Sequence, residues 1–355
     1  MTRRILFTTV CRPFGGVGEG HSVGAELFHY QITREQGIFS LRQVTRGWAL
    51  DYLAENIQFP SVVLHYPSER ELIAELKSTP YDFVGIHFVV ATFHKARRLS
   101  QLVRQYAPNA KIILGGYGTV LPDELLRPFA DHICKEEGIG FMRRLLGEPL
   151  DRPIAHPFAP IPSSRIYSFQ RLDKVVGHIT AGLGCAHGCD FCCTSHFFQR
   201  KYIPFLKTGR EIYDALREME RKASQRKQDL TSLIFIDEDF FAQRTRAMEF
   251  LECIRREGKM QWLTGFGSVN SLSKYTADEI AEMGFEAIWV GYEGAQAGYG
   301  KLKGRPMADL FGELKERGIL IIASMIIGYP YQTPEIVQQE FDGLMALGPS
   351  MRTSE

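Results

Sequence analysis

The sequence predicts an α/β protein in which an N-terminal doubly wound parallel sheet is followed by a partial parallel barrel of strand–helix units. Three observations predict this fold. Strand-like and helix-like patterns alternate over residues 1–148, a proline-rich segment occupies 149–174, and the alternation resumes over 175–355. Such alternation is typical of parallel sheets covered by helices. The length of 355 residues is enough for two domains of about 150 residues each.

The first domain, residues 1–148, contains short apolar runs that predict strands. These runs span 5–10, 61–66, 83–90 and 111–114, whereas 69–77 and 94–106 have the apolar spacing of helices. Open sheets of this kind bind ligands beyond the carboxyl ends of their strands. The segments at those ends are 11–20, 89–94 and 115–119.

The segment 149–174 is predicted to be a linker, because its prolines exclude a helix or a central strand. Five strand–helix units follow it. Their strands are predicted at 175–180, 232–237, 261–267, 286–291 and 319–327, and their helices at 208–223, 244–257, 276–283, 308–317 and 334–347. This repetition is the pattern of a parallel barrel, or of part of one.

Composition excludes several classes of protein. Forty-two basic residues against 41 acidic ones leave a net charge of +1, which argues against nucleic acid and acidic membrane surfaces as partners. The longest apolar stretch, residues 319–327, is nine residues long, far short of the roughly 20 that span a bilayer. We therefore expect a soluble, cytoplasmic protein without a membrane span.

Four of the seven cysteines fall within nine residues, as Cys185, Cys189, Cys192 and Cys193. The first three have C-x-x-x-C-x-x-C spacing directly after a predicted strand, and cysteine thiolates are the usual ligands of iron–sulfur clusters. Zinc is an alternative, with His187 or His196 as a fourth ligand, although zinc sites usually combine two separated pairs. The third interpretation is that the four thiols of this loop bind no metal. The scattered Cys11, Cys134 and Cys253 are expected to be small buried hydrophobes.

The cysteine segment resembles the radical S-adenosylmethionine (SAM) superfamily. Its hallmark is this three-cysteine spacing in the loop after the first barrel strand, with an aromatic residue, here Phe191, before the third cysteine. The resemblance implies that Cys185, Cys189 and Cys192 hold a [4Fe–4S] cluster. It also implies that SAM chelates the open iron through its amino and carboxylate groups, and that Cys193 is not a ligand.

Later strand ends carry residues that the resemblance assigns to SAM. The acidic segment 237–239 follows the second barrel strand, and a buried ammonium needs carboxylate acceptors. Capping of the next helix is the alternative role for Asp237 or Asp239. In members of this superfamily, the residue at the position of Glu293 contacts the ribose of SAM. The end of the fifth barrel strand packs against the adenine of SAM. The implied SAM contacts are Phe191, Glu238, Asp239, Ser268, Glu293 and Ile327.

A doubly wound domain before such a barrel is similar to the cobalamin-binding class of the superfamily. The similarity lies in residues 81–88, 107–117 and 135–138, and a Gly–Gly turn lets backbone approach a flat macrocycle. A Gly–Gly turn after a strand is also common where no ligand is bound. The D-x-H-x-x-G pattern, whose histidine binds cobalt in many such domains, is absent from 11–18. The implied cobalamin contacts are Phe14, Gly15, Gly85, Val89, Gly115, Gly116, Tyr117, Glu137 and Gly138.

The resemblance implies a radical SAM enzyme that cleaves SAM reductively to a 5′-deoxyadenosyl radical and, with cobalamin, transfers a methyl group to an unactivated carbon. Radical cyclisation or rearrangement with an empty N-terminal scaffold is one alternative. A non-catalytic zinc protein is another. A complete barrel of this superfamily has six strand–helix units, whereas five are predicted here, and the substrate, a small molecule, stays unidentified.

An electron donor such as flavodoxin or ferredoxin is the expected protein partner. The stretch 200–227 is rich in basic residues, which most simply form a solvated face. The same charges are suited to docking an acidic donor.

Overall fold

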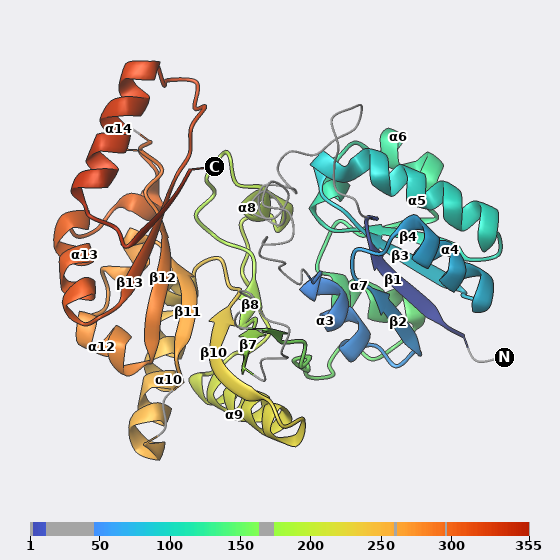
Figure 1. Cartoon of the computed structure of the whole chain (residues 1–355), viewed down its shortest axis with the longest axis horizontal. Coiled ribbons are helices and arrows are strands. Elements are labelled where there is room, and N and C mark those ends of the chain that lie inside the picture. Colours follow the sequence, from blue (N-terminus) through green and yellow to red (C-terminus); the bar gives the residue numbers. More distant parts are fainter. Residues whose placement is uncertain (1–2, 12–45, 163–173, 259–260, 295–296, 355) are drawn as a thin grey trace, which may run out of the picture. The chain divides into compact units, whose positions relative to one another are not determined.

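The computed structural model describes residues 3–11, 46–162, 174–258, 261–294 and 297–354. The chain forms two compact units, Met1–Leu172 and Asp173–Glu355, each with its own parallel sheet (Figure 1). Two predicted cobalamin contacts, Phe14 and Gly15, lie outside the described residues.

The sheet of the first unit has the strand order β2-β1-β3-β4-β5, and every pairing within it is parallel. This is one of the two common orders of doubly wound folds, whose ligands bind where the strand order reverses, here between β1 and β3. The strands are β1 Ile5–Thr9, β2 Ser61–Leu64, β3 Phe83–His87, β4 Lys111–Gly115 and β5 His132–Ile133. The predicted doubly wound sheet is confirmed, with β5 as an addition.

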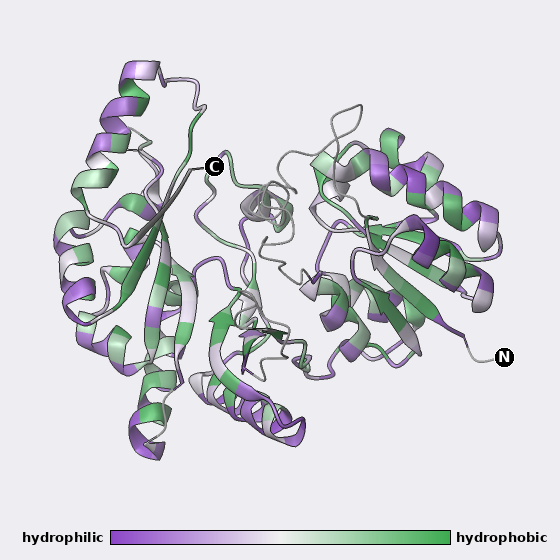
Figure 2. Cartoon of the chain, in the orientation of Figure 1, coloured by the Kyte–Doolittle hydropathy of each residue, from purple (hydrophilic) through white to green (hydrophobic). Residues whose placement is uncertain are grey.

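Helices cover both faces of this sheet, because successive strand residues point to opposite sides. One apolar core joins Leu6, Val84 and Ile112 to α4 and α5, and the other joins Phe7 and Ile113 to α3 and α7. Figure 2 shows the strands as largely hydrophobic ribbons between mixed helices. The helices are α3 Trp48–Asn56, α4 Glu69–Ser78, η2 Val90–Thr92, α5 Phe93–Tyr106, η3 Tyr117–Val120, α6 Asp123–Leu126, η4 Arg127–Phe129 and α7 Gly138–Leu146.

The proline-rich segment is fastened to the first unit by buried polar side chains. The amide of Asn56 exchanges two 2.8 Å hydrogen bonds with the backbone of Ala155. The guanidinium of Arg143, which is 1% exposed, donates to the carbonyl of Arg152 at 2.7 Å and to that of Asn56 at 3.0 Å. The segment also contains the two-residue strand β6 Ile161–Pro162.

The second unit carries parallel strands in the order β14-β13-β12-β11-β10-β7. They are β7 Lys174–Ile179, β10 Asp229–Phe235, β11 Leu263–Gly267, β12 Phe285–Gly291, β13 Leu320–Met325 and β14 Met351–Ser354. The principal helices are α9 Gly209–Gln225, α10 Arg244–Glu257, α12 Ala277–Glu282, α13 Met307–Glu316 and α14 Pro334–Ala346. Shorter elements are β8 Gly182–Leu183, α8 Cys193–Phe197, β9 Ile203–Pro204, η5 Phe240–Ala242, α11 Val269–Leu272 and η6 Gly300–Leu302.

The predicted partial barrel is confirmed, and the sheet extends beyond the five predicted strand–helix units. A sixth parallel strand, β14, follows α14 and pairs with β13. Strand β14 was not predicted, because its four residues are too few for an apolar pattern to emerge.

Local sequence sets the ends of several helices. The Thr208 hydroxyl accepts a hydrogen bond from the Glu211 amide at 3.1 Å and so caps α9. Gly258 ends α10 with a φ of 63°, a left-handed conformation that favours glycine. Pro334 occupies the first turn of α14, where its missing N–H costs nothing. Within the described ranges, the search for an apolar helix long enough to traverse a bilayer found none.

Replacement of Gly118 by alanine is expected to lower the free energy of unfolding by about 1–3 kcal/mol. A Cβ atom at Gly118 would lie 2.2 Å from the Phe88 ring, which is itself buried beneath η3. Gly115→Ala is the matched control, because its Cβ would meet only Cys134, at 3.9 Å. Thermal denaturation of the two variants measures the difference, and equal melting temperatures would contradict the packing argument.

Candidate functional site

The cysteine loop, residues 184–192, runs between β8 and α8. Cys189 is buried, Cys185 and Cys192 are half-buried, and Cys193 is exposed. The hydroxyl of Ser195 holds the loop together, since it accepts from the Gly188 amide at 3.0 Å and donates to the Cys185 carbonyl at 2.9 Å. The predicted ligands therefore share one short hydrogen-bonded loop, and Cys193 differs from them in its exposure.

Burial raises the pKa of the Cys185 thiol to about 11 and also raises the pKa of Cys189. Burial therefore disfavours the thiolate form of these two side chains. Metal coordination removes a thiol proton outright, so a bound metal would oppose this effect of burial. Cys11, Cys134 and Cys253 are buried, as expected for small hydrophobes.

Among the described residues, no three His, Cys, Asp or Glu side chains are grouped around one point as the ligands of a single metal ion. A structural zinc needs four ligands around one ion, and zinc stays an alternative interpretation of the cysteine loop. A cluster is bound through several irons by separate thiolates, and the donor set of three cysteines in one loop fits that chemistry.

Asp239 joins the cysteine loop to the carboxyl end of β11. Its Oδ2 accepts a hydrogen bond from the Ser268 hydroxyl at 2.7 Å and lies 3.2 Å from His187 Nε2 in the cysteine loop. Its Oδ1 accepts from the Ser271 hydroxyl at 2.6 Å. Asp239 precedes η5 without a side-chain capping bond, so the capping alternative does not apply to it.

Glu238 contacts the cysteine loop directly. Its Oε2 accepts a hydrogen bond from the amide of Gly184, the residue before Cys185, at 3.1 Å. The structure therefore brings Glu238, Asp239 and Ser268, all predicted SAM contacts, to one edge of the sheet beside the cysteines.

Asp237 serves the fold, as the anchor of the first barrel strand. The side chain is fully buried, accepts from the Ala181 amide at 2.7 Å and from the Tyr202 hydroxyl at 2.9 Å, and lies 3.5 Å from the guanidinium of Arg246. Burial raises its pKa, and Arg246 opposes that rise. Arg246 also donates to the carbonyls of Ala181 and Leu206.

Glu293, beyond the carboxyl end of β12, is paired with a lysine that the sequence reasoning did not identify. The Glu293 side chain is buried, its backbone has a φ of 60°, and its carboxylate forms an ion pair with Lys301. The ammonium of Lys301 lies 5.1 Å from the centre of the Phe191 ring, in a cation–π contact. Two predicted SAM contacts, Glu293 and Phe191, are thereby linked through one cation.

An aromatic cluster surrounds Phe191 at the same edge. Its ring is 39% exposed, with centroids 5.2 Å from Tyr299 and 5.8 Å from Tyr329. Tyr329 stacks on Tyr331 at 5.4 Å. Ile327, the remaining predicted SAM contact, follows β13 and is 51% exposed. The cluster offers apolar faces next to the cysteine loop, of the kind that a flat heterocycle packs against.

The predicted cobalamin contacts divide into two groups. Val89, Gly115, Gly116 and Tyr117 lie at the carboxyl ends of β3 and β4 and are half-buried. Two exposed valines flank them, Val90 and Val120, so this edge presents apolar surface suited to a macrocycle. Gly116 has a φ of 87°, and a Cβ there would lie 2.6 Å from the Phe88 carbonyl, so the internal turn itself requires glycine.

The other group has structural tasks. Gly85 lies within β3, where a Cβ would approach the Phe7 ring to 2.7 Å. Glu137 caps α7 by accepting from the amides of Ile139 at 2.6 Å and Gly140 at 2.7 Å. Gly138 packs close to Leu53. A cobalamin contact by these residues stays a prediction, since each is already explained by packing or capping.

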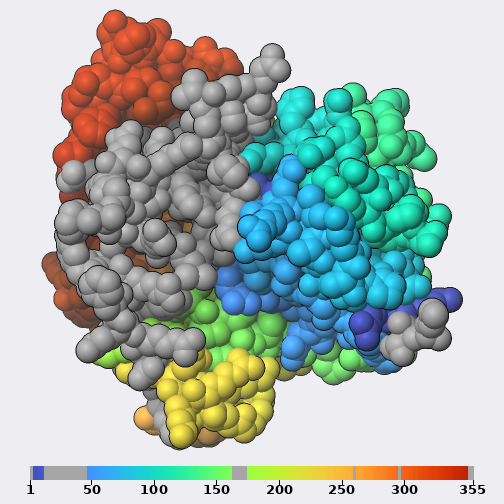
Figure 3. All heavy atoms as spheres, turned by 45° about the vertical axis from the view of Figure 1, so that its right-hand side comes forward, coloured from blue at the N-terminus to red at the C-terminus, as the bar shows by residue number. Residues whose placement is uncertain are grey.

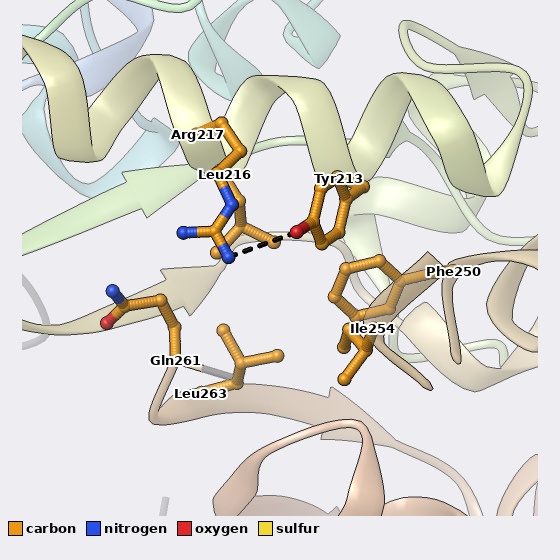
Figure 4. Close-up of a pocket in the computed structure, with 7 residues that line it drawn as sticks. All are labelled: Tyr213, Leu216, Arg217, Phe250, Ile254, Gln261 and Leu263. Atoms are coloured by element: carbon orange, nitrogen blue, oxygen red, sulfur yellow. Dashed lines mark hydrogen bonds between the residues drawn. The ribbon is translucent and has the colours of Figure 1, made fainter. Parts of the chain in front are cut away.

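A small pocket between α9, α10 and β11 lies away from this site. Figure 4 shows its lining, in which Arg217 donates to the Tyr213 hydroxyl at 3.1 Å beside Phe250 and Ile254. Leu263 is the first residue of β11, so the pocket lies at the amino end of that strand. In parallel barrels that end serves stability, whereas chemistry takes place at the carboxyl end.

Comparison with known families and curated proteins agrees with this geometry. Residues 36–146 match the family described as B12 binding domain. An uncharacterized methyltransferase of Pyrococcus horikoshii is 23% identical over 330 residues, which cover 81% of this chain and 67% of that protein. The anaerobic magnesium-protoporphyrin IX monomethyl ester cyclase of Rubrivivax gelatinosus is 22% identical over 337 residues, 79% of this chain and 57% of the cyclase.

Solved structures share the fold of the whole chain. The radical SAM methyltransferase TsrM of Kitasatospora setae, solved with tryptophan and a SAM analogue, superposes with a TM-score of 0.68 at 16% identity, over 99% of this chain and 73% of TsrM. The same enzyme with cobalamin and a [4Fe–4S] cluster gives a TM-score of 0.68 at 16% identity, over 100% and 75%. Together these comparisons confirm the predicted resemblance to the cobalamin-binding class of the radical SAM superfamily.

Several residues of the site were missed by sequence reasoning. Tyr299 and Lys301 come from the segment after β12 and Tyr329 from the segment after β13, and no sequence pattern links them. His187 lies inside the cysteine motif and was considered only as a zinc ligand, but it contacts Asp239. Its position between two predicted cluster ligands was the one available signal.

Proposed function

We propose that this chain is a radical SAM enzyme, with Cys185, Cys189 and Cys192 as the ligands of a [4Fe–4S] cluster. The observation that carries the proposal is the contact of the cysteine loop with two other strand ends. Glu238 accepts from Gly184, and Asp239 meets both His187 and Ser268. Active groups at the carboxyl ends of barrel strands are where this architecture places chemistry.

The residues around the loop are suited to hold SAM. The carboxylate of Glu238, next to Cys185, is placed to accept hydrogen bonds from the SAM ammonium. We assign Glu293 to the ribose hydroxyls and the rings of Phe191 and Tyr329 to the adenine. When bound, the cluster supplies the electron for reductive cleavage of SAM to methionine and a 5′-deoxyadenosyl radical.

We propose cobalamin as the third cofactor and methyl transfer to an unactivated carbon as the reaction. The family match over 36–146 and the apolar edge around Gly115, Val90 and Val120 support this. The chain lacks the histidine motif of many cobalamin domains, so its own residues hold the corrin through backbone and apolar contacts. The substrate is a small molecule, and a cytoplasmic location is part of the proposal.

A radical cyclisation is the second candidate, and one observation favours it. The Rubrivivax gelatinosus relative is named as a cyclase, and its identity to this chain is close to that of the methyltransferase relative. The two candidates share the cluster and SAM, and they differ in whether the substrate gains a methyl group.

Anaerobic reconstitution with iron, sulfide and hydroxocobalamin tests the proposal. We expect about four irons per chain, a broad iron–sulfur absorption and a corrin band that stays with the protein through gel filtration. Iron without corrin would overturn the cobalamin assignment and leave SAM cleavage intact. Zinc without iron would overturn the enzyme assignment.

A further inference from the structure

We infer that the exposed cations Arg200, Lys201 and Lys207, named the basic loop, form the docking surface for an acidic one-electron donor protein of the flavodoxin kind. The inference rests on the proposed function, because a cluster that cleaves SAM has to be reduced from outside the chain. In this step the donor loses one electron and the cluster gains one, and no covalent bond forms or breaks.

All four basic residues of α9 are paired with acidic residues of the helix or of its neighbours. Arg210 pairs with Asp214 at 2.6 Å and with Glu257 at 2.9 Å. Glu218 forms ion pairs with Arg221 at 2.6 Å and with Lys222 at 3.8 Å. The helix lies at the surface, as Figure 3 shows, but its charges are balanced. A balanced face contributes little long-range attraction for an acidic protein.

The basic loop is different. Arg200, Lys201 and Lys207 are all exposed, and within the part of the chain that the structure describes their side chains have no ion pair. The nearest acid on the same segment, Glu211, accepts from the backbone amides of Lys207 and Thr208 in its capping role. Three unbalanced cations within eight residues therefore present the net positive charge that α9 lacks.

The basic loop packs directly on the cysteine loop. A Cβ atom at Gly188, which lies next to Cys189, would be 2.8 Å from Arg200 Nε. A Cβ atom at Gly184, which precedes Cys185, would be 2.2 Å from the Lys201 carbonyl oxygen. A donor docked on Arg200 and Lys201 therefore approaches the cluster ligands through one layer of protein.

The C-cap of α8 holds Arg200 in this position. Gln199 and Arg200 have φ values of 54° and 58°, the left-handed conformation that commonly ends a helix. The Arg200 amide donates to the Ser195 carbonyl at 2.7 Å, and the Gln199 amide donates to the His196 carbonyl at 3.0 Å. Because Ser195 also ties the cysteine loop, Arg200 and that loop are fastened to the same residue.

The test compares two triple variants with equal changes in net charge. Arg200→Gln/Lys201→Gln/Lys207→Gln removes the basic loop, and Arg210→Gln/Arg221→Gln/Lys222→Gln removes paired cations of α9. Binding of oxidised flavodoxin is measured by calorimetry at low and high salt, on protein carrying its reconstituted cofactors. We expect the first variant to raise Kd about tenfold at low salt and the second to change it less than twofold. We also expect the wild-type affinity to fall with salt.

Cluster reduction gives the second measurement. Reduction by flavodoxin hydroquinone should slow in the basic-loop variant, and reduction by dithionite, which needs no docking, should stay at the wild-type rate. Equal weakening by both triple variants, or unchanged binding in the first, would overturn the inference. Failure of the proposed function itself would look different, because dithionite would then reduce no cluster in the wild-type protein.

Discussion

Cys185→Ala is expected to abolish the iron–sulfur absorption of the reconstituted protein and its cleavage of SAM. The loop offers three thiols in a closed, hydrogen-bonded turn, and loss of one leaves too few ligands to hold the cluster with an open iron for SAM. The measurement is iron content and absorption after anaerobic reconstitution, with 5′-deoxyadenosine quantified after dithionite reduction.

Cys193→Ala is the matched control, because it removes an adjacent thiol that is exposed. It should keep the wild-type iron content and cleavage rate. SAM cleavage retained in Cys185→Ala, or a loss in Cys193→Ala equal to that in Cys185→Ala, would show that the ligand assignment is wrong.

The second large effect concerns stability. Arg246→Met is expected to lower the free energy of unfolding by about 3–5 kcal/mol, because it leaves the buried carboxylate of Asp237 without its countercharge. Asp237 is 0% exposed and Arg246 5% exposed. Chemical denaturation followed by circular dichroism measures the change.

Two further variants separate the charge effect from lost packing. Arg244→Met, on the same helix but exposed, should cost less than about 1 kcal/mol. Adding Asp237→Leu to Arg246→Met should recover part of the stability, since an apolar pair replaces a broken ion pair. A double variant that is less stable than Arg246→Met would contradict the electrostatic explanation.

Much of the fold was predictable because its strands are buried on both faces. β1, β3 and β4 are short, continuous apolar runs, and the helices α5 and α10 were predicted to within a residue at each end. The elements that were missed have weak local signals. α7 begins Gly138-Ile139-Gly140, and glycine disfavours helices. The β5 strand has two residues, too few for any pattern.

The site was predictable where a motif or a strand end carried it. The cysteine spacing located the loop, and strand ends located Glu238, Asp239 and Ser268, which the structure brings together. Lys301 was not predictable, because its significance depends on contacts with Glu293 and Phe191. Glu293 and Lys301 both follow β12, whereas Phe191 belongs to the cysteine loop, and only tertiary structure brings the three side chains together.

The hydrogen bonds of Asn56 and Arg143 affect how this protein is divided. Similarity to the B12 binding domain family ends at residue 146, but Arg143 and Asn56 also have backbone partners beyond it, at Arg152 and Ala155. A gene fragment cut at the family boundary would lose these hydrogen bonds, and we expect its free energy of unfolding to be lower than that of a fragment that keeps them. The region of family similarity and the first compact unit, Met1–Leu172, therefore end at different residues. A fragment made to fold by itself should include the proline-rich segment.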